Sequence, residues 1–183
     1  MGKKYTDIPE KLQSFIQQQK IFFVATAARD GRVNLSPKGL DTLRILNKNK
    51  VLWLNLTGNG NETAGHLLDN DRMTLMFCAF DGKPLILRLY GHAQIIHPRN
   101  SQWNELITHF PPIAGARQII DMTVDLVHCS CGIGVPYFDF VGERNMLLEW
   151  AEKKGEAGIK QYWRDRNQIS LDGKPTKILD SES

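Results

Sequence analysis

The residues best suited to chemistry lie in a glycine-containing loop, within the segment NLTGNGNETAGHL at 55–67. Asn61 has a side chain suited to cap a helix that begins just after it. The backbone N–H groups of a first helical turn have no partner within the helix, and the helix dipole is positive there. Such a turn can hold an anion. The loop therefore predicts a phosphate site, to which Thr57, Asn59 and Thr63 would add side-chain hydrogen bonds.

A second segment, RVNLSPKG at 32–39, can supply the positive charge that a phosphate needs. Asn34, Ser36 and Lys38 share one face of a strand, because successive strand side chains point to opposite sides. Lys38 can then form a charge-assisted hydrogen bond to the anion. Two other interpretations stay open: the loop can be an ordinary strand-to-helix turn, and the polar strand face can be solvated. The glycine spacings of dinucleotide and nucleoside triphosphate sites are missing.

Helices and strands must position these residues, and hydrophobic periodicity gives their coarse order. The sequence predicts helices over residues 8–19, 62–70, 100–109, 143–154 and 158–167. It predicts strands over 21–28, 32–36, 51–56, 73–80, 85–97 and 118–129. In the hairpin formed by the first two strands, we expect Val33 and Leu35 to face the core. Hairpin-linked strands without regular helix alternation favour an antiparallel barrel with peripheral helices.

The composition narrows the class of protein. A chain of 183 residues with 42% hydrophobic residues is long enough for one domain with a real core. No apolar run approaches the roughly 20 residues of a membrane span, and the first residues lack a secretory signal, so we expect a cytoplasmic protein with no membrane partner. The 23 basic residues are scattered among 20 acidic ones, which gives no support for nucleic acid as a partner. Three cysteines cannot pair completely, in agreement with a reducing compartment.

The order of three segments resembles the FMN-binding split barrel of the pyridoxamine 5'-phosphate oxidase-like superfamily. The segments are FFVATAARDGRVNLSPKG, VLWLNLTGNGNETAGHL and DRMTLMFCAFDGKPLILRLYGHAQII, within residues 10–97. The resemblance implies a mainly β fold with flanking helices, an antiparallel split β-barrel of roughly six strands. It also implies one domain over residues 1–183, with an N-terminal helix at about 8–19 and a C-terminal helical extension at about 143–168.

The same resemblance implies a flavoprotein that binds FMN, a homodimer that builds the flavin pocket from two chains, and an oxidoreductase with a small-molecule substrate. The residues expected to bind the cofactor are Asn34, Ser36, Lys38, Leu56, Thr57, Asn61 and Thr63. Pyridoxamine phosphate oxidases have basic residues in the helix-start turn, where this chain has Glu62 and Thr63. Phosphate binding would then rest mainly on Lys38, and oxidation of vitamin B6 itself is not implied. No side chain is singled out as a catalytic acid or base.

Other functions of a split barrel stay open. The protein can be a non-catalytic flavin carrier or sensor, or it can bind haem or a deazaflavin in place of FMN. His66, His92 and His97 are the candidate ligands of a haem or a metal, although each also suits an ordinary surface position. Cys129 and Cys131 form a C-x-C pair without a second ligand pair at zinc spacing, so no metal site is predicted.

Overall fold

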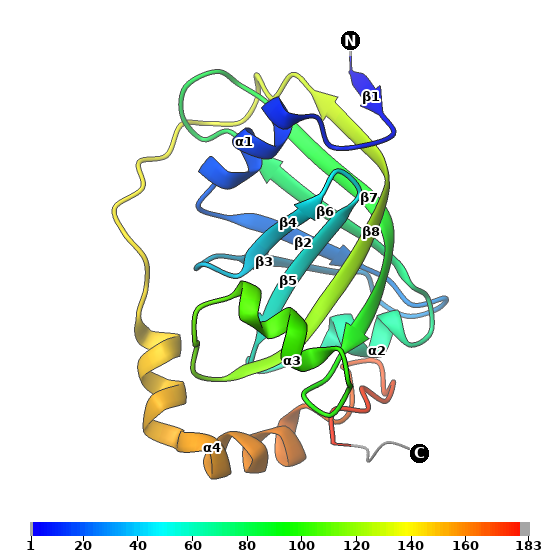
Figure 1. The fold of residues 1–183 in the computed structure, drawn as a ribbon, viewed down its shortest axis with the longest axis vertical. Coiled ribbons are helices and arrows are strands. Elements are labelled where there is room, and N and C mark those ends of the chain that lie inside the picture. The colour runs from blue at the N-terminus through cyan, green and yellow to red at the C-terminus, as the bar shows by residue number, and fades with distance from the viewer. Residues whose placement is uncertain (1, 180–183) are drawn as a thin grey trace.

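Eight strands form one sheet, which curves into an open barrel with helices around it (Figure 1). The computed structural model describes residues 2–179. The strands are β1 (Lys3–Tyr5), β2 (Phe22–Thr26), β3 (Asn34–Lys38), β4 (Leu43–Asn47), β5 (Lys50–Leu56), β6 (Arg72–Cys78), β7 (Ile86–Ile96) and β8 (Ala116–Ser130). Their order is β3-β2-β6-β7-β8-β5-β4, with β1 beside β8, and every pair is antiparallel. Since β3 and β4 end this path without pairing, the barrel is split, which confirms the expected fold class.

The helices lie at the rim of the barrel and beyond it. They are α1 (Glu10–Gln18), α2 (Glu62–Leu67), α3 (Trp103–Leu106), the 3-10 helix η1 (Ile107–His109) and α4 (Met146–Arg166). Gly155 interrupts α4 with φ 61° and ψ 173°, a left-handed conformation that suits glycine. The two helices expected over 143–154 and 158–167 are therefore confirmed as the halves of one kinked element.

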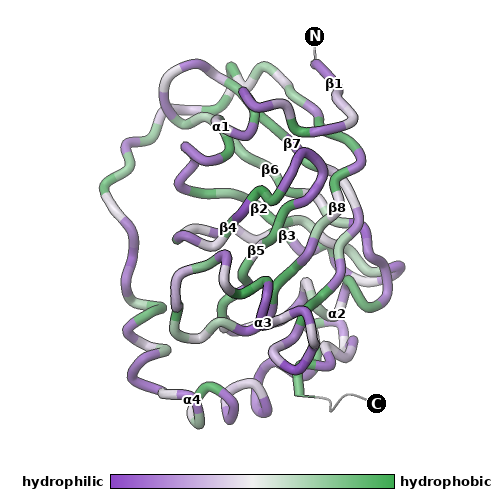
Figure 2. The backbone as a smooth tube through the Cα atoms, in the orientation of Figure 1, coloured by the Kyte–Doolittle hydropathy of each residue, from purple (hydrophilic) through white to green (hydrophobic). Residues whose placement is uncertain are grey.

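Apolar side chains of the strands fill the barrel, and α1 closes one end of it. Leu12 and Ile16, one turn apart on α1, are both buried in this core, as the periodicity of the segment predicts. Leu75, Leu89 and Ile120 from three neighbouring strands are fully buried. Figure 2 shows hydrophobic residues along the strands of the sheet and mostly hydrophilic residues along α4.

The outer and inner faces of β3 are the reverse of those expected from the sequence. Val33 and Leu35 are 73% and 62% exposed, so the prediction that they face a core is wrong. The half-buried residues are the polar ones: Asn34, Ser36 and Lys38. They pair across the hairpin with the buried residues of β2, namely Thr26, Val24 and Phe22. Alternation defines two faces of a strand without saying which is inside, and here polar groups inside the barrel bond the polar face.

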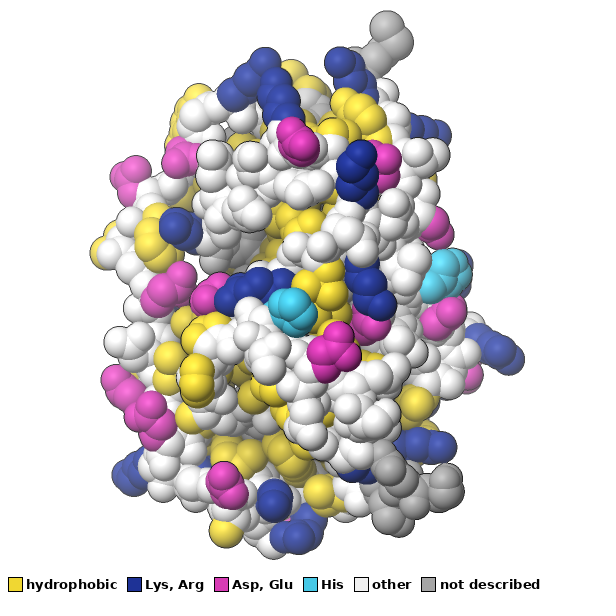
Figure 3. Space-filling model, viewed as in Figure 1, with side chains coloured by type: hydrophobic (Ala, Val, Ile, Leu, Met, Phe, Trp, Pro, Cys, Tyr) yellow, Lys and Arg dark blue, Asp and Glu magenta, His cyan; other side chains and the backbone are white. Residues whose placement is uncertain are grey.

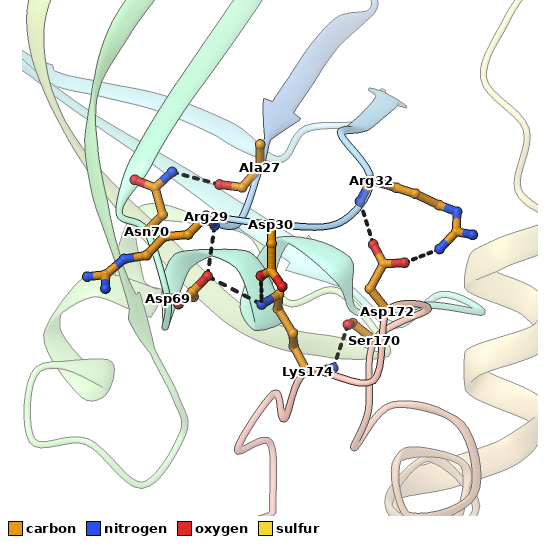
Figure 4. Close-up of polar contacts among 9 residues, drawn as sticks. All are labelled: Ala27, Arg29, Asp30, Arg32, Asp69, Asn70, Ser170, Asp172 and Lys174. Atoms are coloured by element: carbon orange, nitrogen blue, oxygen red, sulfur yellow. Dashed lines mark hydrogen bonds and ion pairs between the residues drawn. The ribbon is translucent and has the colours of Figure 1, made fainter.

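The chain after β8 crosses the molecule twice. Residues 131–145 contain no helix or strand and run to α4, and the chain after α4 returns to α2 (Figure 1). There the Asp172 carboxylate accepts hydrogen bonds from the backbone N–H (2.6 Å) and the guanidinium of Arg32. Lys174 lies between Asp30, at 2.5 Å, and Asp69, at 3.4 Å (Figure 4). The C-terminal segment is thus attached to the β2–β3 turn and to the end of α2.

Charges of both signs are mixed on the face of the molecule seen in Figure 3. No helix within residues 2–179 combines the length and the apolar character needed to cross a membrane.

Candidate functional site

A cavity of about 760 Å³ lies beside the ends of β3 and β5. Lys38, Trp53, Leu56 and Gly58 belong to its wall on the sheet side. Three phenylalanines also line it: Phe80, Phe138 and Phe140. Two of them come from the segment at 131–145. The volume is within the range of cofactor and small-molecule sites.

Lys38 is a cation inside this cavity. Its Nζ lies 5.1 Å from the centre of the Trp53 ring, a cation–π distance. Burial, together with the positive charge of Arg117, lowers the pKa of Lys38 to about 8. Within the part of the chain that the structure describes, Lys38 forms no ion pair. The cavity therefore favours a negatively charged ligand near this side chain.

Arg117, on β8, is a second buried cation, and the sequence reading missed it. It is 3% exposed, and burial lowers its pKa to about 9. Its guanidinium donates hydrogen bonds to the carbonyl oxygen of Gly60 (3.0 Å) and to the side-chain oxygens of Asn167 (2.9 Å) and Asn55 (3.2 Å). None of these acceptors is charged, and Arg117 forms no ion pair with any described carboxylate. A single arginine in the apolar run of β8 was the signal that could have identified it.

The loop at 57–61 is held by buried contacts. The Thr57 hydroxyl donates to the Gly115 carbonyl (2.8 Å) and accepts the indole N–H of Trp163 (2.9 Å). Asn61 occupies the N-cap position of α2 but makes no capping hydrogen bond. Its side chain is 1% exposed, and both polar atoms lack a partner among the described residues. Buried polar groups are normally bonded, so an unpartnered amide here is consistent with a ligand site.

Glu62 is an acidic residue directly after this loop, and its hydrogen bond explains why it is tolerated there. Its carboxylate accepts a hydrogen bond from the backbone N–H of Leu171 (2.9 Å), so it is bonded to the C-terminal segment. The helix it opens, α2, has only six residues. The helix dipole therefore contributes less to an anion site than the sequence suggested, and the buried cations contribute more.

A chain of side-chain hydrogen bonds joins the polar face of β3 to α2. Ser36 donates to Asn34 Oδ1 at 2.9 Å, and Asn34 Nδ2 lies 3.4 Å from the hydroxyls of both Thr26 and Thr63. Thr26 in turn lies 3.2 Å from His66 Nδ1. Residues 29 positions apart are thus brought together, as the sequence argument required.

The structure places the expected cofactor residues in three groups. Lys38 and Leu56 line the cavity. Asn34, Ser36 and Thr63 form a hydrogen-bonded chain, Thr57 and Asn61 are buried in the loop, and none of these five residues lines the cavity. Their contact with a cofactor stays a prediction.

The cysteines do not assemble a metal site. Cys78 and Cys129 are buried, which raises the pKa of both thiols, while Cys131 is exposed. Across residues 2–179 there is no group of three or more His, Cys, Asp or Glu side chains placed to hold a metal ion.

Comparison with known proteins gives similarities in both sequence and structure. Residues 8–131 match the family model described as pyridoxamine 5'-phosphate oxidase. The chain is 33% identical over 191 residues to the pyridoxamine 5'-phosphate oxidase family protein ustO of Aspergillus flavus, covering 93% of this chain and 76% of that protein. Among solved structures, a HupZ variant from Group A Streptococcus has a TM-score of 0.54 at 18% identity, covering 67% of this chain and 99% of its own. A candidate pyridoxamine 5'-phosphate oxidase from Lactobacillus delbrueckii also has a TM-score of 0.54, at 14% identity, over 67% of this chain and 94% of that one. The two structures share the fold of this chain.

Proposed function

The chain belongs to the pyridoxamine 5'-phosphate oxidase family, and on that basis we propose that it is a flavoprotein that binds FMN through its phosphate group. We further propose that it is an oxidoreductase with a small-molecule substrate.

The observation that carries this proposal is a pair of buried cations: Lys38 lines the cavity, and Arg117 bonds Asn55, which also lines it. Lys38 and Arg117 have lowered pKa values because each is removed from water, and no described carboxylate neutralises either one. Burying an unpaired charge is costly, and a phosphate dianion beside Lys38 would offset that cost for this residue. The dianion would also be attracted to the charge of Arg117 on the carbonyl side of the loop. An uncharged ligand would not.

The residues present fit FMN in composition as well as in charge. Lys38 would bind the phosphate, with the loop at 57–61 beside it. The chain of Asn34, Ser36 and Thr63 offers the hydroxyl and amide groups that a ribityl chain can bond. Leu56 lines the apolar part of the cavity, where a ring system would be shielded from water. The bound flavin would supply hydride transfer, while the protein would bind and orient it. We assign the end of the cavity near Phe138 and Phe140 to the substrate.

The proposal includes a homodimer in the cytoplasm. Leu35, on the outer face of the edge strand β3, and Val33, directly before that strand, expose apolar side chains. Exposed apolar groups on an edge strand favour association with another chain. A second copy covering this face would remove both side chains from water. The free thiols of the described chain suit a reducing compartment.

Cofactor analysis of the purified protein tests the proposal. We expect flavin absorbance, a released cofactor with the mass of FMN, and tighter binding of FMN than of riboflavin, which lacks the phosphate. Equal affinity for the two would contradict the phosphate assignment. A Soret band would instead identify the cofactor as haem, and a released cofactor with the mass of a deazaflavin would identify it as a deazaflavin. Assays of the holoprotein with NADH and NADPH then separate an oxidoreductase, which turns over, from a carrier or sensor, which does not.

A further inference from the structure

The loop at 58–60 has all its carbonyl groups bonded on one side. The Asn167 side-chain amide donates to the carbonyl oxygens of Gly58 (3.1 Å) and Asn59 (3.3 Å). The Arg117 guanidinium donates to the next carbonyl, that of Gly60, and also to Asn167 itself. Three consecutive carbonyls therefore point toward one small cluster made by Arg117 and Asn167.

The orientation of the Asn167 amide is fixed by its neighbours. Its Oδ1 faces a guanidinium, which can only donate, and its Nδ2 faces two carbonyl oxygens, which can only accept. Exchanging the oxygen and nitrogen would break every one of these bonds. Asn167 is also 0% exposed, so water does not compete for them.

The carbonyl directions determine where the N–H groups point. In a planar trans peptide the C=O of one residue and the N–H of the next point in opposite directions. The peptides of this loop are trans, so the N–H groups of Asn59, Gly60 and Asn61 point away from Asn167. None of the three donates a hydrogen bond to another described residue. Successive free N–H groups on one side of a loop form a concavity that binds anions.

We propose that Asn167 and Arg117 are positioning residues for the anion site, because they turn the N–H groups of residues 59–61 toward the ligand. This inference rests on the proposed function and names what orients its phosphate site. The unpartnered, buried side chain of Asn61 stands at the end of the same loop and is an independent sign of a ligand there. The backbone, together with Lys38, would then do what basic side chains do in the relatives that have them at residues 62 and 63.

Binding titrations with Asn167→Asp test the positioning role. This variant keeps the oxygen that faces Arg117 but replaces the donor with an acceptor, so it repels the carbonyls of the loop. We expect FMN affinity to fall about ten- to a hundredfold while riboflavin affinity stays unchanged. Gln168→Ala is the matched control, because the neighbouring amide bonds only Arg164 within the described chain. If Asn167→Asp does not fold, Arg117→Lys is tested in its place. This variant keeps the positive charge, but one ammonium group cannot reproduce the hydrogen bonds of the guanidinium group. We expect the same fall in FMN affinity.

A second measurement uses inorganic phosphate as the probe, first with the wild-type protein and then with Asn167→Asp. In the NMR spectrum of the labelled wild-type protein, phosphate should shift the amide signals of Asn59, Gly60 and Asn61 and leave that of Gly82, in the β6–β7 turn, in place. Unmoved loop amides would overturn the inference. So would a variant that keeps the wild-type ratio of FMN to riboflavin affinity, even though the proposed function would then survive. The opposite outcome is also distinguishable. If FMN and riboflavin bind equally, the proposed function is wrong. If phosphate still shifts the loop amides of the wild type but not those of Asn167→Asp, the positioning role of Asn167 is nevertheless supported.

Discussion

Lys38 and Arg117 approach closely enough for the charge of Arg117 to add to the effect of burial, and together they bring the pKa of Lys38 to about 8. A cation with a lowered pKa loses its proton as the pH rises through that value. FMN affinity should therefore be constant near pH 7 and fall above pH 8, by about tenfold for each further pH unit until the pKa of the bound form is reached. The phosphate stays dianionic throughout, because its second pKa is about 6.

Fluorescence titrations from pH 6.5 to 9.5 would measure this dependence, with riboflavin as the control ligand. Riboflavin affinity should stay level through pH 8. A parallel fall for both flavins would mean that the titrating group shapes the pocket and does not contact the phosphate.

Removing the lysine should matter more than removing the threonine expected to act with it. Lys38→Ala removes a charge-assisted hydrogen bond worth roughly 1.5 to 3 kcal/mol, whereas Thr63→Ala removes a neutral one nearer 0.5 to 1.5 kcal/mol. We expect Lys38→Ala to weaken FMN about ten- to a hundredfold and riboflavin hardly at all. Calorimetric titration of both ligands measures the difference. Lys20→Ala is the matched control, since Lys20 also lines the cavity but its Nζ lies over the ring of Phe140, 5.5 Å from the centroid, and not over Trp53. An equal loss of FMN affinity in both lysine variants would refute a specific role for Lys38.

Trp163 should contribute to stability through its indole N–H. The side chain is 8% exposed and its donor bonds the Thr57 hydroxyl, so Trp163→Phe loses a buried hydrogen bond and leaves a small cavity. The free energy of unfolding should fall by about 1 to 3 kcal/mol in urea titrations. Trp150→Phe serves for comparison, because the half-buried Trp150 makes an edge-on contact with Tyr162 that a phenyl ring can retain. Equal losses in the two variants would show that the bond to Thr57 adds nothing.

A charge on the outer face of β3 should separate the proposed dimer. Leu35→Glu places a carboxylate on the face that we assign to the second copy, so light scattering should change from about twice the chain mass to the mass of one chain. Leu171→Glu changes a leucine in the C-terminal segment that is 75% exposed, against 62% for Leu35, and should leave the mass unchanged. A monomeric wild type that binds FMN tightly would rule out a pocket shared between two chains.

The sequence predicted the fold well because its signals are local. Period-two alternation and turn residues located most strands within a few positions, and the split in α4 was anticipated around Gly155. The short strands β1 and β4 were missed, since each has few residues and their pairing depends on neighbours far along the chain. The faces of β3 were inverted because alternation cannot tell the inside of a barrel from the outside when the interior is polar at that point.

The candidate site was predicted only in part, for a related reason. Lys38 and Thr63 were predicted from their segments, because a strand face and a helix start have recognisable patterns; the structure places Lys38 in the cavity wall, and the contact of both with a cofactor stays a prediction. Arg117 and Asn167 were not, because their importance arises only where β8 and the end of α4 meet the loop. Hydrogen bonds that span 57 and 109 positions leave no periodic trace in a single sequence.

The dependence of the loop on Trp163, Asn167 and Leu171 also sets an order of events during synthesis. The ribosome completes every strand of the sheet at Ser130, well before these three residues are made. A nascent chain can thus collapse its apolar core while the loop at 57–61 still lacks the partners that fix its carbonyls. The binding geometry of the loop can therefore be completed only after the strands of the scaffold have been made.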